Sequence, residues 1–537
     1  MNQQVFLYDT TLRDGAQSEG LSLSLEDKLK IAKELDRFGM NWIEGGWPGS
    51  NPKDCAFFER ARDLDLKHAR LVAFGSTRRR SQKTEDDANL KALLDAHTPT
   101  TALVGKTWTL HVTRVLGATP DENLAMIRDS VAFLKDHGKE VVYDAEHFFD
   151  GYAADPDYAL ATLEAAVGAG ADWLTLCDTN GGALPWQVSD VVRKVVATFD
   201  TPLGVHTHND AELAVANALA AVEAGCTMVQ GTVNGYGERC GNANLCSLIP
   251  TLNLKMDQPC VPPAHLPLLT ELSRYVSEVA NLNPNAHAPY VGRSAFAHKG
   301  GIHVAAVEKV SESYEHISPG LVGNKRHIVV SELSGRGNIR TRAGELGLDV
   351  AGLETEVLER IKELEHQGFQ YEAAEGSFEL LTHRMDEDYQ PPFKLRDLFV
   401  VTERRAGVET AEATVKLAIG DEIAHTVAEG IGPVQALDRA LRKALLPHFP
   451  ELECVRLVDY KVRILDTAAA TGATTRVLIE AAADEERWTT VGCSANIIEA
   501  SAQALVDSLE LFLTRHACRD ELSIYELDLR HCTRMRA

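Results

Sequence analysis

The sequence predicts a (β/α)8 TIM barrel, followed by helical linker subdomains and a C-terminal α+β regulatory domain with an internal duplication. Three observations predict this architecture. Eight short β-rich runs alternate with helical stretches as far as Gly235, polar residues gather where these runs end, and a sheet-plus-helix pattern occurs twice near the C-terminus. Because 537 residues exceed what one core organises, we expect three domains, at residues 1–263, 264–388 and 389–537.

The repeating unit has the length of a parallel βαβ step. The runs begin near Val5, Asn41, Arg70, Thr101, Glu140, Asp172, Pro202 and Thr227, at intervals of 25 to 39 residues. Such intervals accommodate a strand and its crossover helix. The alternative, an open doubly wound sheet, usually shows G-x-G-x-x-G after its first strand. Here that turn reads DTTLRDGAQ, which favours the closed barrel.

Polar segments follow the strands and are expected to meet at one rim. They read DTTLRDGAQ, EGGWPGSN, DAEHF, CDTNGG, HTHND and NGYGERCGNAN. In a parallel barrel the C-terminal strand ends form one face, which carries the active site. We therefore expect these segments to build one site.

The remainder of the chain divides into two parts. From Ala264 to Met385 the pattern is helical, and Pro391-Pro392 marks the next boundary. The segments starting at Glu412 and Thr475 each show two strand-like runs, a glycine turn and a helix. In GIGPVQAL, free backbone N–H groups before Pro433 suit an anion or carboxylate, although an ordinary strand-to-helix turn explains the motif equally well.

Composition excludes several classes of function. The net charge of −24, without a basic face or basic amphipathic helix, predicts no nucleic-acid and no membrane partner. No secretory signal is visible, and the ten cysteines lack paired spacing. We therefore expect reduced thiols in a cytoplasmic protein. An acidic enzyme acting on anions needs local positive charge from a metal, arginine or helix N-termini.

The clearest metal-ligand candidates are His206 and His208. Residues two apart in a strand face the same side, so both imidazoles can reach one ion. Asp14, after the first strand, adds a carboxylate, and Asn242, after the eighth, adds an amide oxygen directly or through water. This set suits Mg²⁺, Mn²⁺ or Zn²⁺ with positions left open to chelate a 2-oxo acid.

Other rim residues are candidates for catalysis and substrate binding. Arg13 can stabilise an enolate or alkoxide oxygen, or form a salt bridge to Asp14 or Glu238. Glu146 can orient a group or share a proton, and a substrate carboxylate can accept from Thr179, although a threonine there is usually a cap. The residues assigned to substrate binding are Arg13, Gln17, Tyr143 and Thr179.

Two further groups lie in other segments. His298 and His303 in AHKGGIH are candidates for the general base that removes a thioester α-proton. Arg78, Arg79 and Arg80 can meet coenzyme A phosphates, but a solvated basic run is the simpler interpretation.

Together these motifs resemble one family. DTTLRDGAQ, HTHND, NGYGERCGNAN and AHKGGIH, in this order, are similar to the α-isopropylmalate synthase and homocitrate synthase family of the DRE-TIM metallolyase superfamily. GIGPVQALDRAL resembles the regulatory domain of that family. VGKTWTLHV, YDAEHFFDGY and CDTNGGALPW look most like the branch that uses pyruvate. The sequence departs from the isopropylmalate pattern after the fourth and sixth strands, where it reads GKTWTLH and CDTNGG.

The resemblance implies an activity and roles. A divalent metal held by Asp14, His206 and His208, with Asn242 alongside, would fix pyruvate, and a base including His303 would deprotonate acetyl-CoA. His303 would act on the partner's barrel in a homodimer, and isoleucine would be the effector. The alternatives are another 2-oxo acid (2-oxoisovalerate or 2-oxoglutarate), a 3-hydroxy-3-methylglutaryl-CoA-type lyase, or a barrel that only senses an amino acid.

Overall fold

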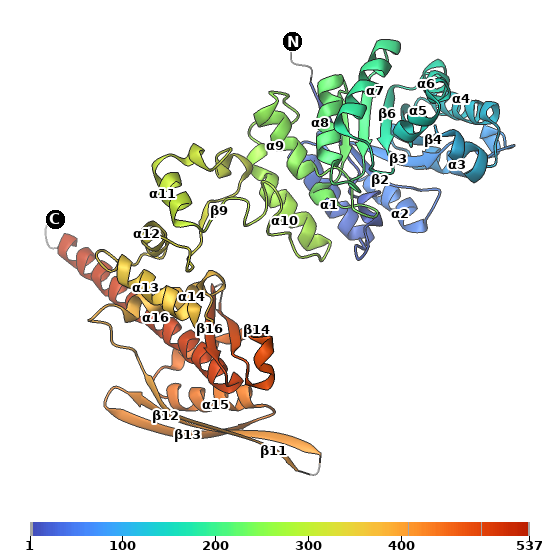
Figure 1. The fold of residues 1–537 in the computed structure, drawn as a ribbon. Helices are drawn as coiled ribbons and strands as arrows, with labels where there is room; N and C mark the ends of the chain where they lie inside the picture. The colour runs from blue at the N-terminus through green and yellow to red at the C-terminus, as the bar shows by residue number, and fades with distance from the viewer. Residues whose placement is uncertain (1–3, 406, 485, 535–537) are drawn as a thin grey trace. The chain divides into compact units, whose positions relative to one another are not determined.

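The computed structural model describes residues 4–405, 407–484 and 486–534, which form two compact units (Figure 1). The first unit contains the residues up to Phe296 together with Ile317–Arg326. The second contains Ala297–His316 and the residues from His327 onward. Among the described residues, none of the helices combines the length and the hydropathy that a membrane span requires.

The first unit is the predicted closed barrel of eight parallel strands. The strands are β1 (Phe6–Asp9), β2 (Trp42–Gly46), β3 (Arg70–Ser76), β4 (Thr100–Lys106), β5 (Glu140–Glu146), β6 (Trp173–Asp178), β7 (Leu203–Thr207) and β8 (Met228–Gly231). Each begins within one residue of its expected start, and β1 pairs with β8. This closure confirms the barrel and excludes the doubly wound sheet.

Helices surround the strands, as Figure 1 shows. They are α1 (Leu25–Phe38), α2 (Pro52–Ala61), α3 (Ala88–Asp95), α4 (Pro120–Asp136), α5 (Phe148–Ala154), α6 (Pro156–Gly168), α7 (Pro185–Thr198), α8 (Ala214–Ala224), α9 (Leu245–Lys255) and α10 (Leu269–Val279). Local signals set their ends: Ser24 and Asp27 form a capping box at α1, which ends at left-handed Gly39. The largest apolar core lies between these helices and the sheet.

The barrel interior is apolar at one end and polar at the other. Phe6, Trp42 and Trp173 pack edge to face near the N-terminal strand ends, with ring centroids 5.6–5.9 Å apart. Toward the C-terminal ends the inward positions are polar, including Asp144 and Gln230. Because side chains alternate along each strand, inward-facing positions occur at both ends of the barrel. The change from apolar to polar residues at these positions therefore indicates that the site lies at the C-terminal end.

A buried ion pair joins α1 to α2, and a further hydrogen bond joins α1 to the end of β2. The ammonium of Lys28 donates to Asp54 and to the Gly45 carbonyl, and both charged side chains are buried. We expect Lys28→Met to lower the free energy of unfolding by about 3–5 kcal/mol, because Asp54 would keep a buried charge without its cation. Urea unfolding measures this. Lys30→Met, at an exposed position of the same helix, should change it by less than about 0.5 kcal/mol; equal effects would contradict the prediction.

The first part of the second unit is helical, with one two-stranded sheet. Its elements are β9 (Ala297–His298), α11 (Gly301–Lys309), β10 (His327–Ile328), α12 (Arg336–Glu345), α13 (Glu354–His366) and α14 (Glu375–Arg384). Val357, Ile361 and Phe378 belong to its small core. This region covers the later part of the helical linker expected at residues 264–388, whereas α10, in the earlier part, belongs to the first unit.

The C-terminal part contains the predicted duplication. One copy is β11 (Lys394–Arg405), β12 (Val408–Ile419), β13 (Glu422–Gly430) and α15 (Pro433–Leu445); the other is β14 (Arg456–Ile464), β15 (Thr475–Ala483), β16 (Glu486–Ser494) and α16 (Ile497–Arg534). Both sheets are antiparallel. Each copy has three strands rather than the two expected, since β11 and β14 were not recognised. Residues of α15 and α16 share one core.

Candidate active site

Three side chains of types that can hold a metal ion converge at the barrel rim. The Asp14 Oδ2 atom lies 3.3 Å from His206 Nε2 and 3.7 Å from His208 Nε2, and the two Nε2 atoms are 3.2 Å apart. All three residues are buried. Among the residues that the structure describes, this is the group of His, Cys, Asp and Glu side chains with metal-site geometry.

Local structure explains the convergence. His206 lies in β7, and His208, two residues on, has the same facing and forms a bridge with Asn242. Asp14 lies in a tight turn after β1, where the Thr10 carbonyl accepts from the backbone of Gly15. Since β1, β7 and β8 are neighbours in the closed sheet, their loops meet.

Electrostatics favour the metal-binding forms of Asp14 and His208, the carboxylate and the neutral imidazole. Burial alone would raise the pKa of Asp14, but the charge of Arg13 and the hydrogen bond from His206 hold it well below its usual range. Burial and neighbouring His206 lower the pKa of His208 to about 4. Burial also acts to lower the pKa of His206, yet Asp14 raises it overall. A carboxylate beside a neutral imidazole is a suitable donor set for a divalent cation.

Asn242 has an acceptor that fits a cation. Its Nδ2 donates to the Tyr236 carbonyl at 3.2 Å. Its Oδ1 is buried and has no hydrogen-bond partner among the described residues. An unpaired buried oxygen costs free energy unless something occupies it, so the residues present fit a metal held by two nitrogens, a carboxylate and this amide.

Arg13 is held by two carboxylates. Its Nε donates to Glu44 at 2.6 Å, and its NH1 lies 3.4 Å from Asp14. Its guanidinium also stacks 3.9 Å from the ring centroid of Phe74. Glu44 is fully buried and accepts from the hydroxyls of Tyr8 and Thr10 as well. Of the salt bridges expected for Arg13, the one to Asp14 is present, and Glu44 is an additional partner.

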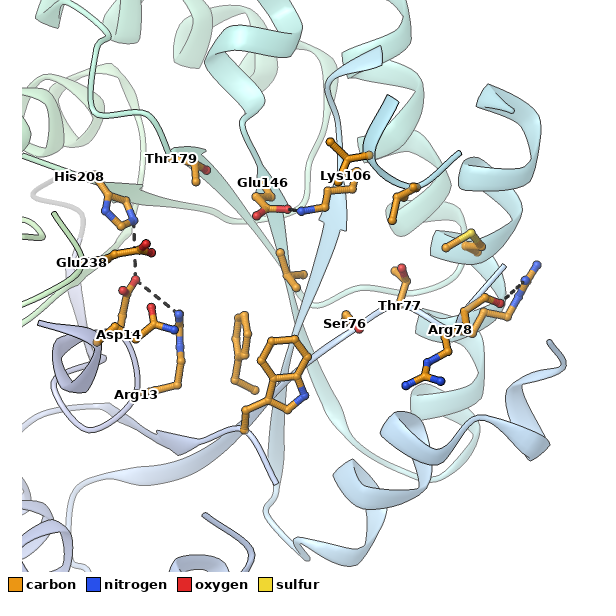
Figure 2. A pocket seen from close by; sticks show the side chains of 18 of the residues that line it. Arg13, Asp14, Ser76, Thr77, Arg78, Lys106, Glu146, Thr179, His208 and Glu238 are labelled. Carbon is orange, nitrogen blue, oxygen red and sulfur yellow. Dashed lines mark hydrogen bonds and ion pairs between the residues drawn. The ribbon is translucent and has the colours of Figure 1, made fainter. Parts of the chain in front are cut away.

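A pocket of about 590 Å³ opens beside the ligand cluster. Figure 2 shows Arg13, Asp14 and His208 on one side, Glu146 and Lys106 across from them, and Arg78 at the far end. Its wall also contains Gln17, Trp47, Phe74, Val104, Thr179 and Glu238. The structure therefore brings most predicted site residues to one cavity.

Glu146 and Thr179 both have partners in the pocket wall. Glu146 forms an ion pair with Lys106, which is its register partner on β4. The Thr179 hydroxyl oxygen accepts from the backbone N–H of His147 at 2.8 Å. Because that bond uses an acceptor site, the hydroxyl hydrogen of Thr179 stays available to donate to a ligand.

Tyr143 is not brought to the pocket. It belongs to the core between sheet and helices, and its ring lies against Gly105. Asp144 and Glu146, one position away on either side of Ala145, face the interior. The period of two in a strand gives Tyr143 the opposite facing.

The two histidines of AHKGGIH lie in the second unit. His298 is buried in β9, with its Nε2 3.2 Å from Glu315 Oε1. His303 is exposed on α11, and its ring stacks on Tyr314 with a centroid distance of 4.2 Å. Of the two, His303 is therefore the accessible imidazole.

The arginine run after β3 is not uniformly solvated. Arg78 is buried between Glu122 and Asp129, which accept at 3.3 and 2.8 Å. Arg79 and Arg80 are exposed at the pocket margin. Of the three, these two have no carboxylate partner among the described residues, although Arg80 donates to the Gly117 carbonyl.

Four polar residues of the site were missed from the sequence. Glu44, Lys106, Asp144 and Gln230 all lie within or at the end of apolar strands. The signal available was a charged or amide residue at alternate positions of WIEGG, LVGK, VVYDAE and MVQG. Such positions face inward when the strand closes a barrel.

A TIM barrel with a cluster of metal-ligating side chains at its rim defines the class of protein. The chain belongs to the HMGL-like family, which matches residues 4–276. Residues 290–368 match the homocitrate synthase post-HMGL domain-like family, and 372–513 the LeuA allosteric (dimerisation) domain. The resemblance predicted from the motifs is thereby confirmed.

Individual proteins that are similar to this chain over nearly its full length give a more specific comparison than the family. The chain is 53% identical to an (R)-citramalate synthase of Synechocystis sp., over 96% of this chain and 97% of that protein. It is 52% identical to the (R)-citramalate synthase of Geobacter sulfurreducens, over 94% and 97%. Identity to the 2-isopropylmalate synthase of Methanocaldococcus jannaschii is 31%, over 95% of each.

Proposed function

We propose that this protein is an (R)-citramalate synthase. It condenses acetyl-CoA with pyruvate and water to give citramalate and coenzyme A. The observation that carries the proposal is the cluster of Asp14, His206 and His208, which together with Arg13 lies beside one pocket, in a chain 50–53% identical to three (R)-citramalate synthases.

The metal is a divalent cation, Mg²⁺ or Mn²⁺, with Zn²⁺ as the alternative. Asp14, His206, His208 and Asn242 would hold it. When bound, it supplies Lewis-acid polarisation of the keto oxygen of pyruvate. The unpaired Asn242 oxygen and the convergent Nε2 atoms support this assignment.

The remaining residues bind and move protons. Arg13, fixed by Glu44, stabilises negative charge on the former keto oxygen. Thr179 donates to the pyruvate carboxylate, and Gln17 lines the same cavity. His303, from the partner in a homodimer, takes a proton from the acetyl methyl, whose carbon then attacks the keto carbon. Water cleaves the thioester, while Glu146, paired with Lys106, orients or shares a proton.

Acetyl-CoA needs cationic partners for its phosphates. Arg79 and Arg80 are exposed where the pocket reaches solvent. We assign them to these phosphates, and Arg78, already neutralised by two carboxylates, to holding the loop.

The test is thiol release from acetyl-CoA with a panel of 2-oxo acids, with and without divalent metal and EDTA. Metal-dependent release with pyruvate, and little with 2-oxoisovalerate or 2-oxoglutarate, is the expected result. Preference for a bulkier acid would support 2-isopropylmalate or homocitrate synthase. Absence of release in metal-loaded protein would favour a lyase or sensor. A 3-hydroxy-3-methylglutaryl-CoA-type lyase is disfavoured by the domain at 372–513.

We assign feedback control to the C-terminal domain, with isoleucine as effector in a cytoplasmic isoleucine pathway. The LeuA allosteric domain match supports this, and Gly432, the N-cap residue of α15, which has no side-chain cap, is a candidate carboxylate contact. Deleting residues after Asp388 should abolish inhibition by isoleucine; inhibition that persists would contradict the assignment. Since the deletion unpairs Arg384 from Asp507 and Glu510, full-length Arg384→Gln is the control.

The homodimer is expected to use an apolar sheet face. Phe399, Val401, Ile423 and Val427 lie exposed on the face of β11–β13 away from α15. An apolar stripe of this kind is typical of an interface. Phe399→Glu with Ile423→Glu should convert the dimer to monomer in light scattering. Glu451→Lys, at an exposed position outside this sheet, should leave the mass unchanged, and an unaltered mass in the double variant would exclude this face.

A further inference from the structure

A buried hydrogen-bond chain runs from His206 into the barrel. His206 Nδ1 lies 3.0 Å from Gln230 Oε1, and Gln230 Nε2 donates to Asp144 Oδ1 at 3.0 Å and to Thr175 Oγ1 at 3.2 Å. All four residues are buried. Strand register aligns them: His206 pairs with Gln230 between β7 and β8, and Asp144 with Thr175 between β5 and β6.

The donors and acceptors along this series of hydrogen bonds can be arranged in only one way. An ionised carboxylate only accepts hydrogen bonds, so Asp144 must face the NH₂ end of the Gln230 amide. The amide oxygen then faces His206, whose Nδ1 must carry the hydrogen and donate it. The Nε2 atom, 3.3 Å from Asp14, is then the ring nitrogen that can offer a lone pair to a cation held between them. Asp144, which reaches His206 only through Gln230, therefore determines the tautomer of this candidate metal-binding histidine.

The contact with Gln230 gives the Asp144 carboxyl the role of hydrogen-bond acceptor. Burial, with Glu44 as a neighbouring carboxylate, raises its pKa to about 6, while His206, Arg13 and the bond from Gln230 act to lower it. Its only hydrogen bond among the described residues comes from Gln230.

We infer that Asp144 is a positioning residue, which acts through Gln230 to hold His206 with an unprotonated Nε2 toward the metal position. The inference rests on the proposed metal site. Asp144 touches neither the metal ligands nor the pocket; it determines which way the Gln230 amide points.

Replacing Asp144 with asparagine keeps the side-chain volume but no longer fixes which end of the Gln230 amide faces His206. In Asp144→Asn the new amide can donate or accept, so Gln230 can turn its NH₂ toward His206 and favour the wrong tautomer. We expect Mn²⁺ binding to weaken by about 10- to 100-fold, the usual effect of losing an outer partner. Gln230→Leu, which removes the acceptor, should weaken binding by a similar factor.

Exchanging the two functional groups should restore binding. In Asp144→Asn with Gln230→Glu, the new carboxylate accepts from His206 Nδ1 and from the new amide, so every hydrogen bond keeps its direction at His206. Affinity should return to within about 3-fold of wild type. A purely structural role for Asp144 would not give this rescue, because the double variant differs from wild type at two buried positions.

The experiment titrates Mn²⁺ into metal-free full-length protein and reads the free ion by electron paramagnetic resonance, with circular dichroism to verify folding. Asp178→Asn, a buried carboxylate of β6 bonded to the backbone of Gly182 and Ala183, is the matched control and should bind like wild type. Wild-type affinity in folded Asp144→Asn, or no rescue in the double variant, would overturn the inference. If Asp144→Asn does not fold, Gln230→Leu and the double variant decide it. Absence of Mn²⁺ binding by wild type would instead refute the metal site.

Discussion

Asp14→Asn is expected to lower kcat for thiol release by about 1000-fold and to remove tight Mn²⁺ binding. Asp14 is the carboxylate of the ligand cluster, and its charge offsets both the cation and Arg13. A bound divalent ion supplies several kcal/mol of transition-state stabilisation, and about 4 kcal/mol corresponds to three orders of magnitude.

The measurement combines initial rates with Mn²⁺ titration. Glu19→Gln changes an exposed carboxyl in the same loop and should leave both quantities unaltered. More than about a tenth of wild-type kcat in Asp14→Asn, or undiminished Mn²⁺ affinity, would show that this cluster is not the metal centre.

The second large effect is expected for Arg13→Met, on stability and on activity. The substitution leaves Glu44, which is fully buried, with only the hydroxyls of Tyr8 and Thr10. An uncompensated buried charge costs about 3–5 kcal/mol. Loss of the guanidinium from the reacting oxygen should lower kcat by about 100- to 1000-fold.

Unfolding in urea, followed by tryptophan fluorescence, measures the first effect. Trp42, Trp47, Trp108, Trp173 and Trp186 lie in the first unit, and only Trp488 lies in the second, so the signal reports mainly on the barrel. Glu44→Gln combined with Arg13→Met removes both charges and should recover most stability but no activity. If activity returned with stability, Arg13 would be structural only.

The sequence alone determined the barrel and the side chains of the candidate metal cluster. The strand starts were predictable within one residue because the alternation of β-rich runs and helices is regular, and parallel strands bring their ends to one rim. His206 and His208 were identifiable from their spacing, and Asp14 from its place after β1. These inferences need only periodicity and chain order.

Strands without a buried face were not predictable. Along β14 the residues are exposed or half-buried at every position, so RLVDYKVRI shows no two-residue alternation. This strand is recognisable only once it pairs with β15, and β11 likewise with β12.

Only the tertiary structure decided which polar groups become partners. Lys106 meets Glu146, and His206 meets Gln230, because the closed sheet sets the register between strands that are far apart in the chain. It also decided that Asp144 rather than Tyr143 faces the interior, since a shift of one residue reverses the facing. Local sequence fixes which residues are polar; barrel closure fixes which neighbour each of them finds.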